Sequence, residues 1–311
     1  MLALAHFLLV VLPEGQKQKN LDVQRDEQEY FRHRLVERGH VARVYAIWWL
    51  FSIGTLGAIV NAMSDKNPGH LHPITQTIRE IYAVFAELGF EIALGPELEY
   101  ERYNFDALNI PADHPSRDMQ DTFWLKEKPT AAKGPKGEPL GRRLLATQTS
   151  AVQIRFMETH QPPFRTLVPG KVFRNEATDA THEAQFFQLE GLLVDRKVSL
   201  AELKGVLEHA FKKLFGPQSD IRFRPSFFPF TEPSVEVDVK WQKPGEAEPR
   251  WLEVLGAGLV HPSVLKAGGI DPTEWQGFAF AFGVDRIVML KHGIDDIRLL
   301  YNGDLRFLNQ F

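Results

Sequence analysis

The chain has 311 residues, of which 44% are hydrophobic and 24% are charged, so it can bury a large core in one or two domains. Its formal net charge of -4 argues against a protein that coats nucleic acid by charge alone. It has no cysteine, which excludes disulfides, thiolate chemistry and cysteine-ligated zinc.

The first 68 residues differ from the rest in composition. Residues 14–40 are strongly charged and predict a solvated helix, whereas residues 44–63 carry no charge and are long enough for a membrane helix. Three explanations stay open: a membrane anchor, an apolar helix buried against a partner, or a gene start that is truncated or wrongly joined to the rest of the chain. We predict an atypical, mostly helical segment over residues 1–68 and a separate domain over residues 69–311.

Helix and strand signals then follow in order. Pro73 fits a first helical turn, apolar residues recur behind it at helical spacing, and Gly89 predicts the end of that helix. Residues 89–100 are expected to form a strand, in which Pro96 suits an edge. The Pro- and Gly-rich basic stretch at residues 126–143 predicts a solvated loop.

A hairpin between residues 173 and 191 gathers unusual polar chemistry. Its two arms predict strands around a polar loop, and side chains alternate between the faces of a strand. The residues predicted to share a face are Arg174 and Glu176 on the first arm, and Phe186, Gln188 and Glu190 on the second. A cation, carboxylates, an amide and a ring on one surface suit a nucleotide bound beside a second small polar molecule. A solvated hairpin with scattered charges would show the same alternation.

A second amphipathic helix is predicted over residues 199–216. Ser199 and Glu202 have capping-box spacing, and Gly216 is placed to end the helix. Short strands between the helices predict an α+β fold with a mostly antiparallel sheet flanked by helices.

Three further motifs complete the pattern. Residues 224–233 read Arg-Pro-Ser-Phe-Phe-Pro-Phe-Thr-Glu-Pro, residues 251–262 read Trp-Leu-Glu-Val-Leu-Gly-Ala-Gly-Leu-Val-His-Pro, and residues 277–286 read Gly-Phe-Ala-Phe-Ala-Phe-Gly-Val-Asp-Arg. Together with the hairpin and the segment ending at residues 89–96, they resemble the alpha subunit of bacterial phenylalanyl-tRNA synthetase, a class II aminoacyl-tRNA synthetase. The segment at residues 89–96 looks like motif 1 of that class, the Phe-Arg-x-Glu hairpin like motif 2, and residues 277–286 like motif 3.

The resemblance implies a function and partners. The chain is expected to activate L-phenylalanine with ATP to phenylalanyl adenylate and to transfer it to tRNA(Phe), as the catalytic alpha subunit of a cytoplasmic alpha2beta2 heterotetramer that uses Mg2+. A catalytically silent synthetase-like binding module stays open as an alternative. So does a membrane-associated interaction protein, which only residues 44–63 suggest.

The resemblance also implies site residues. Activation needs no protein nucleophile, because the amino acid carboxylate itself attacks the α-phosphate of ATP. Arg174, Glu190 and Gln188 are the expected catalytic residues, with Arg174 bridging the carboxylate and the α-phosphate. The expected ATP-binding residues are Arg174, Glu176, His182, Phe186 and Arg286. A structural salt bridge is the alternative for each arginine.

The amino acid is expected at the other end of the site. Glu190 suits an α-ammonium group, because a desolvated cation requires a partner. The expected phenylalanine-binding residues are Ser150, Gln148, Gln188, Glu190, Phe228, Phe230 and Ala279, with Gln148 standing where the family often has histidine. Phe228 and Phe230, two apart on a strand, can face one pocket, or can be ordinary core residues. Glu232 matches a magnesium ligand that the family shares with the beta subunit.

Overall fold

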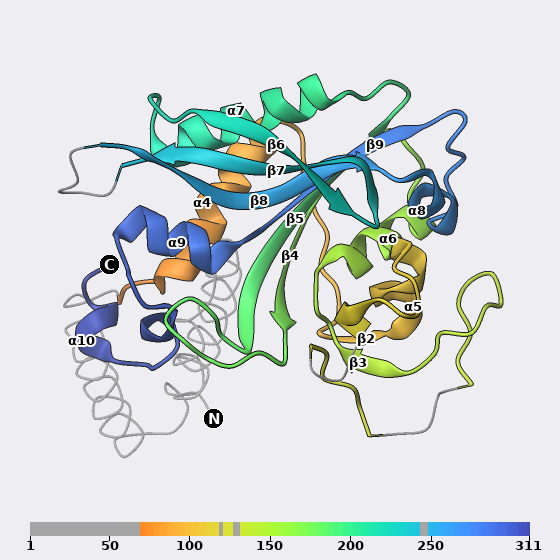
Figure 1. Cartoon of the computed structure of the whole chain (residues 1–311), viewed down its shortest axis with the longest axis horizontal. Coiled ribbons are helices and arrows are strands. Elements are labelled where there is room, and N and C mark those ends of the chain that lie inside the picture. Colours follow the sequence, from red (N-terminus) through yellow and green to blue (C-terminus); the bar gives the residue numbers. More distant parts are fainter. Residues whose placement is uncertain (1–68, 118–120, 127–130, 243–247) are drawn as a thin grey trace, which may run out of the picture. The chain divides into compact units, whose positions relative to one another are not determined.

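A computed structural model of the chain describes residues 69–117, 121–126, 131–242 and 248–311 (Figure 1). The predictions for residues 1–68, including the apolar stretch at residues 44–63, lie outside this part of the chain. Within the described ranges, none of the helices is both long and apolar enough to cross a membrane.

Among the described residues, seven strands form one sheet in the order β1-β4-β5-β9-β8-β7-β6 (Figure 1). β1 runs parallel to β4 and every other neighbouring pair is antiparallel, which confirms the predicted sheet. The bounds are β1 (Glu91–Ile92), β4 (Phe164–Phe173), β5 (Gln185–Asp195), β6 (Ile221–Phe228), β7 (Thr231–Trp241), β8 (Arg250–Val260) and β9 (Gln276–Gly283). A second sheet pairs β2 (Leu98–Tyr100) with β3 (Arg143–Leu145).

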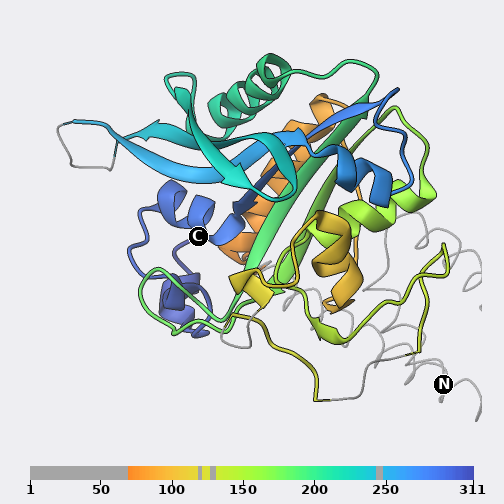
Figure 2. The ribbon, with the colours of Figure 1, turned by 45° about the vertical axis from the view of Figure 1, so that its right-hand side comes forward.

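Helices flank both faces of the large sheet, as Figures 1 and 2 show. A first core joins one face to α4 (Pro73–Glu87), α7 (Leu200–Phe215), α9 (Val284–His292) and the 3-10 turn η3 (Ile297–Leu300). A second core joins the other face to α5 (Glu101–Asn104), η1 (Asp106–Leu108), α6 (Ser150–Thr159) and α8 (Pro262–Ala267). The short elements η2 (Pro115–Arg117) and α10 (Leu305–Leu308) complete the described fold.

Side chains of β5 and β9 point alternately to the two faces of the sheet, so that successive residues pack into different cores. Leu189 and Leu193 of β5 pack into the first core, whereas Leu192 packs into the second. On β9 the phenylalanines at 278, 280 and 282 all enter the first core, and Ala279 packs against the second. The face that carries Glu190, two residues before Leu192, is therefore the face of α5, α6 and α8.

The two predicted helices are confirmed with their ends. The ring Nδ1 of His72 accepts from the backbone N–H of Ile74 at 3.2 Å and caps α4, and Gly89 ends it with a left-handed φ of 77°. α7 begins with the predicted capping box, in which Ser199 and Glu202 exchange hydrogen bonds. For both helices, the spacing of apolar residues and the capping residues were sufficient to predict the helix and its ends.

The single strand predicted over residues 89–100 is wrong. The chain leaves the large sheet after Ala93, whose N–H donates to Leu167 at 2.8 Å, and joins the small sheet where Glu97 accepts from Ala146 at 2.9 Å. Between them, a Cβ on Gly95 would lie 2.1 Å from Val152, and Pro96 has no N–H to give to a ladder. The close approach to α6 and the missing donor break the strand there.

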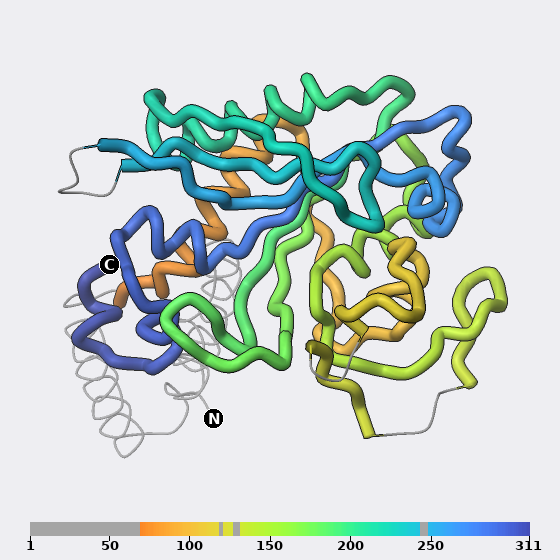
Figure 3. Tube along the Cα trace, in the orientation of Figure 1, coloured from red at the N-terminus to blue at the C-terminus, as the bar shows by residue number. Residues whose placement is uncertain are grey.

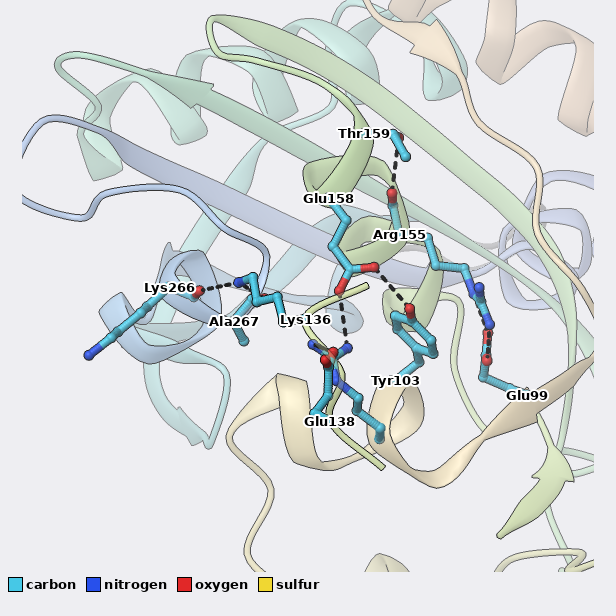
Figure 4. A network of polar contacts seen from close by, with 10 residues as sticks. Glu99, Tyr103, Lys136, Glu138, Arg155, Glu158, Thr159, Lys266 and Ala267 are labelled. Atoms are coloured by element: carbon cyan, nitrogen blue, oxygen red, sulfur yellow. Dashed lines mark hydrogen bonds and ion pairs between the residues drawn. The ribbon is translucent and has the colours of Figure 1, made fainter. Parts of the chain in front are cut away.

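The basic stretch predicted as a solvated loop contacts the fold in its described part. Lys136 donates to the last carbonyls of α8, at 3.4 Å to Lys266 and 3.2 Å to Ala267, and Glu138 binds Arg102 of α5 at 2.5 Å (Figure 4). Residues 131–141 therefore connect α8 to α5.

Candidate active site

Glu190 is the buried carboxylate of the candidate site. It lies in β5 and is 2% exposed, and its Oε2 accepts from Ser150 Oγ at 2.7 Å and from Gln153 Nε2 at 2.6 Å. Ser150 and Gln153 sit one helical turn apart at the start of α6, on the side that faces β5. Burial raises the pKa of Glu190 to about 7, although the hydrogen bond from Ser150 opposes the shift.

Two buried oxygen acceptors lie unpaired on this face. Within the described residues, neither Oε1 of Glu190 nor Oε1 of Gln188 has a hydrogen-bond partner, although both atoms are shielded from solvent. Gln188 is 8% exposed and shares the face of Glu190, as predicted, because it precedes Glu190 by two residues in β5. A buried acceptor without a donor costs about 1–3 kcal/mol, so a ligand with N–H donors would be stabilised there.

Arg174 lies just past the end of β4 and starts the loop of the predicted hairpin. Its backbone N–H donates to Ala184 at 2.9 Å, and its guanidinium carbon lies 5.0 Å from the centroid of the Phe186 ring. Nε makes a long contact of 3.5 Å to the carbonyl of Thr147. Burial lowers the pKa of Arg174, and the carboxylates of Glu176, Glu190 and Asp121 oppose that shift.

The hairpin is confirmed, but its first arm is shorter than predicted. β4 ends at Phe173, so Arg174 and Glu176 belong to the loop, and the strand alternation predicted for them does not apply. The chain turns away from the second arm after Arg174, because the N–H of Asn175 donates to Asp121 at 3.3 Å. Within the loop, Asp179 Oδ1 accepts from the N–H of Thr181 at 2.6 Å and of His182 at 2.8 Å.

His182, one of the predicted ATP-binding residues, lies on this loop. His182 is more than half exposed, and its Nδ1 lies 3.1 Å from Asp179. Hydrogen bonds from Thr181 and His182 lower the pKa of Asp179. Figure 3 traces the loop beside the C-terminal segment, where the N–H of Ile297 donates to Ala180 at 2.9 Å.

Arg286 is exposed and lies in the first turn of α9, which begins directly after β9. The preceding residue, Asp285, is buried, and its Oδ2 accepts from the N–H of Phe187 at 2.7 Å. The Tyr301 hydroxyl donates to the other oxygen. Asp285 thus joins the backbone beside Phe186 to the backbone beside Arg286, two of the predicted ATP-binding residues.

Small residues of β8 and β9 lie on the site face of the sheet. Glu190 pairs with Ala281 of β9, and Ala281 pairs with Gly256 of β8, so the three share one face. A Cβ on Gly256 would lie 2.9 Å from the Phe228 ring, which places that ring over the same face. Ala279, half-buried, lies on this face in the neighbouring row.

Phe228 and Phe230 lie together, but not on one strand as predicted. Phe228 is the last residue of β6, whereas Phe230 lies in the turn to β7. Their rings stack at 5.7 Å between centroids with an angle of 3° between their planes. Pro229 between them supports the turn, since proline cannot donate to a ladder.

Glu232 is the predicted metal ligand, and its surroundings contain little else for a cation. Its side chain is 74% exposed and lies 3.4 Å from Nε2 of His261. Across the described ranges, no group of three or more His, Asp or Glu side chains could hold a metal ion.

The structure also adds residues that sequence reasoning missed. Gln153 donates to Glu190, Asp285 accepts from the N–H of Phe187, and the Asn104 carbonyl accepts from Gln148 Nε2 at 3.0 Å. The spacing of Ser150 and Gln153, which are three residues apart, would have been a usable signal for Gln153 had a helix been predicted there. The other two depend on contacts between distant segments.

Comparison with known proteins identifies the family. The family described as "tRNA synthetases class II core domain (F)" matches residues 59–311. The phenylalanine–tRNA ligase alpha subunit of Synechocystis sp. is 49% identical over 253 residues, which cover 81% of this chain and 70% of that protein. This chain belongs to the phenylalanine–tRNA ligase alpha subunit family.

Other members of the family have a similar sequence identity to this chain. The alpha subunit of Bacillus subtilis is 49% identical over 266 residues, covering 82% of this chain and 73% of its own. The alpha subunit of Caldanaerobacter subterraneus is 51% identical over 249 residues, which cover 78% of this chain and 69% of that protein. Among solved structures, pyrrolysyl-tRNA synthetase from Desulfitobacterium hafniense superposes with a TM-score of 0.56 over 80% of each chain, at 15% identity. That likeness confirms the class II fold and nothing finer.

Proposed function

We propose that this family member is the catalytic alpha subunit of a cytoplasmic phenylalanine–tRNA ligase, which activates L-phenylalanine with ATP and transfers it to tRNA(Phe). The observation that carries the proposal is the pair of unpaired, buried acceptors on Glu190 and Gln188, close in the chain to the Arg174–Phe186 pair. Relatives named as ligases at about half identity support this activity over a silent binding module or a membrane-associated interaction protein.

The amino acid is bound by its ammonium group at one end and by its ring at the other. The ammonium group donates to Oε1 of Glu190 and Oε1 of Gln188, which supplies the donors that both atoms lack. Ser150 assists indirectly, because its hydroxyl fixes the second oxygen of Glu190. The phenyl ring packs against Phe228 and Phe230, with Ala279 leaving room for it.

ATP occupies the hairpin side. The guanidinium of Arg174 binds the amino acid carboxylate and the α-phosphate together, which its planar fork of donors permits. Phe186 stacks on adenine and Arg286 lies against its other face or binds the terminal phosphates, while Glu176 reads the adenine edge. His182, on the exposed loop, is placed to approach the phosphates.

Two transfers follow. An oxygen of the phenylalanine carboxylate attacks the α-phosphorus, the bond to the β-phosphate oxygen breaks, and pyrophosphate leaves with the electron pair. A ribose hydroxyl of the terminal adenosine of tRNA then attacks the carbonyl carbon and expels AMP. The chain contributes position and charge: Arg174 neutralises the carboxylate and phosphate that must approach each other.

A magnesium ion and a second subunit are part of the proposal. Mg2+ prefers oxygen ligands, retains several waters, and would neutralise phosphate charge. Glu232 is an exposed carboxylate and fits as one ligand of a site that another chain completes, since the described residues offer no cluster of three. That chain would be the beta subunit of an alpha2beta2 assembly.

The test is phenylalanine-dependent exchange between ATP and pyrophosphate, with the full chain co-expressed with the beta subunit of the same source. We expect Arg174→Ala to lower exchange at least 100-fold, the order expected for loss of a group that stabilises transition-state charge. Arg165→Ala is the matched control, because Arg165 is an exposed arginine in β4 that bonds only the Leu88 carbonyl among the described residues. An assembled complex without exchange, or equal loss in both variants, would contradict the proposal.

A further inference from the structure

Asn104 makes an unusual set of hydrogen bonds beside the site. It is the last residue of α5 and is fully buried. Its Nδ2 donates to Thr147 Oγ1 at 2.8 Å, its Oδ1 accepts from the N–H of Thr147 at 3.2 Å, and its main-chain carbonyl accepts from Gln148 Nε2 at 3.0 Å. One residue of α5 therefore holds two consecutive residues of the segment that leads into Ser150.

These bonds orient the Gln148 amide. A carbonyl oxygen can only accept, so the end of Gln148 that meets Asn104 is the NH2 group. The carbonyl is available because the last carbonyls of a helix have no partner within the helix. No described residue donates a hydrogen bond to Oε1 of Gln148, which lies two residues before Ser150, the donor to Glu190.

We propose that Asn104 is a positioning residue for substrate binding: it fixes Thr147 and turns Gln148 so that Oε1 serves as an acceptor for the α-ammonium group. The inference rests on the proposed function. An ammonium group has three N–H donors, and Oε1 of Gln148 would join Oε1 of Glu190 and Oε1 of Gln188 as the third acceptor. Without the Asn104 contacts, the amide could present its NH2 end, which repels a cation.

A separate set of contacts holds α5 against α6 and supplies a control. At the far end of α6, Glu158 binds Arg102 at 3.1 Å and accepts from the Tyr103 hydroxyl at 2.9 Å (Figure 4). Glu158→Gln removes the ion pair but keeps an acceptor for Tyr103. It weakens the packing of the two helices and leaves the Asn104 bonds to Thr147 and Gln148 in place.

The experiment measures exchange kinetics of Asn104→Ala in the full complex with the beta subunit. We expect the KM for phenylalanine to rise about tenfold, the effect of weakening a hydrogen bond to a charged group, while the KM for ATP stays within about twofold. Two competitive inhibitors separate positioning from general damage. Phenylalaninol, which has the ammonium group, should bind about tenfold more weakly, and 3-phenylpropionate, which lacks it, should bind unchanged.

Two further variants make the result decisive. In a Gln148→Leu background, Asn104→Ala should add no further change in KM, because the group it orients is gone. Thr147→Val, which loses only the hydroxyl partner, should reproduce part of the effect if Asn104→Ala folds poorly. The inference is overturned if both inhibitors weaken equally, if Glu158→Gln gives the same rise in KM, or if the Asn104 and Thr147 variants leave KM unchanged. Wild-type complex without exchange would instead reject the proposed function.

Discussion

Replacing Glu190 with glutamine should abolish activity and yet stabilise the protein above neutral pH. Burial raises the pKa of Glu190 to about 7 from the ordinary carboxyl value of 4.5. At about 1.36 kcal/mol for each pKa unit, ionised Glu190 destabilises the fold by about 3 kcal/mol. Below pH 4.5 the group is neutral in both states and has no effect, so the loss of stability develops as pH rises from 4.5 to 7.

Thermal unfolding of the full chain measures this difference. For a protein of this size, about 1 kcal/mol shifts Tm by roughly 2–4 °C, so Glu190→Gln should exceed wild type by roughly 6–12 °C at pH 8. At pH 5 the gap should shrink to about 2–4 °C, because the group is largely neutral in the folded state. Glu176→Gln, an exposed carboxylate of the same hairpin, should follow wild type at both values.

Parallel pH dependence of Tm in wild type and Glu190→Gln would refute this reasoning. The same ionisation should appear in catalysis, since only charged Glu190 pairs with the ammonium group. The KM for phenylalanine should then rise about tenfold for each pH unit below 7 and level off above it.

Substitutions at three other positions test the site. Ala279→Val should exclude phenylalanine, and Ala279→Gly should admit para-substituted analogues, as competition in the exchange assay would reveal; unchanged preference would remove Ala279 from the pocket. Gly256→Ala places a Cβ 2.9 Å from the Phe228 ring and should raise the KM for phenylalanine about tenfold with little change for ATP, since overpacking costs about 1–3 kcal/mol. Asp285→Ala frees the N–H of Phe187 and should raise the KM for ATP about tenfold; an equal rise for phenylalanine would indicate general damage instead.

Local signals predicted most of the fold. The ends of α4 and α7 depend on caps and glycines a few residues apart, and β5 is regular enough that alternation placed Gln188 and Glu190 correctly on one face. The likeness of five motifs to one family implied the class II fold, an antiparallel sheet flanked by helices. These features can be predicted because each is decided within a short stretch of chain or by family resemblance.

Two of the misses occurred where distant segments decide the local conformation. The strand predicted over residues 89–100 is interrupted because Gly95 lies against Val152 of α6. The residues near Gly95 in the sequence give no sign of this contact. Asn104 was missed because its partners follow 43 and 44 positions later. The role of Glu232 stays a prediction, since the described residues of this chain do not complete a cation site.

Side chains of β9 alternate between the two faces of the sheet, and they are large on one face and small on the other. Its phenylalanines fill a core on one face, while the alanines between them lie on the other face, where we propose that the substrate phenylalanine binds. Because side chains in a strand repeat every two residues, loss of one residue from the turn before Gln276 would exchange the two sets. Rings would then occupy the binding face and the core would be left underfilled. With phenylalanine bound on that face as proposed, catalysis depends on the length of the turn before Gln276, which lies outside the proposed site.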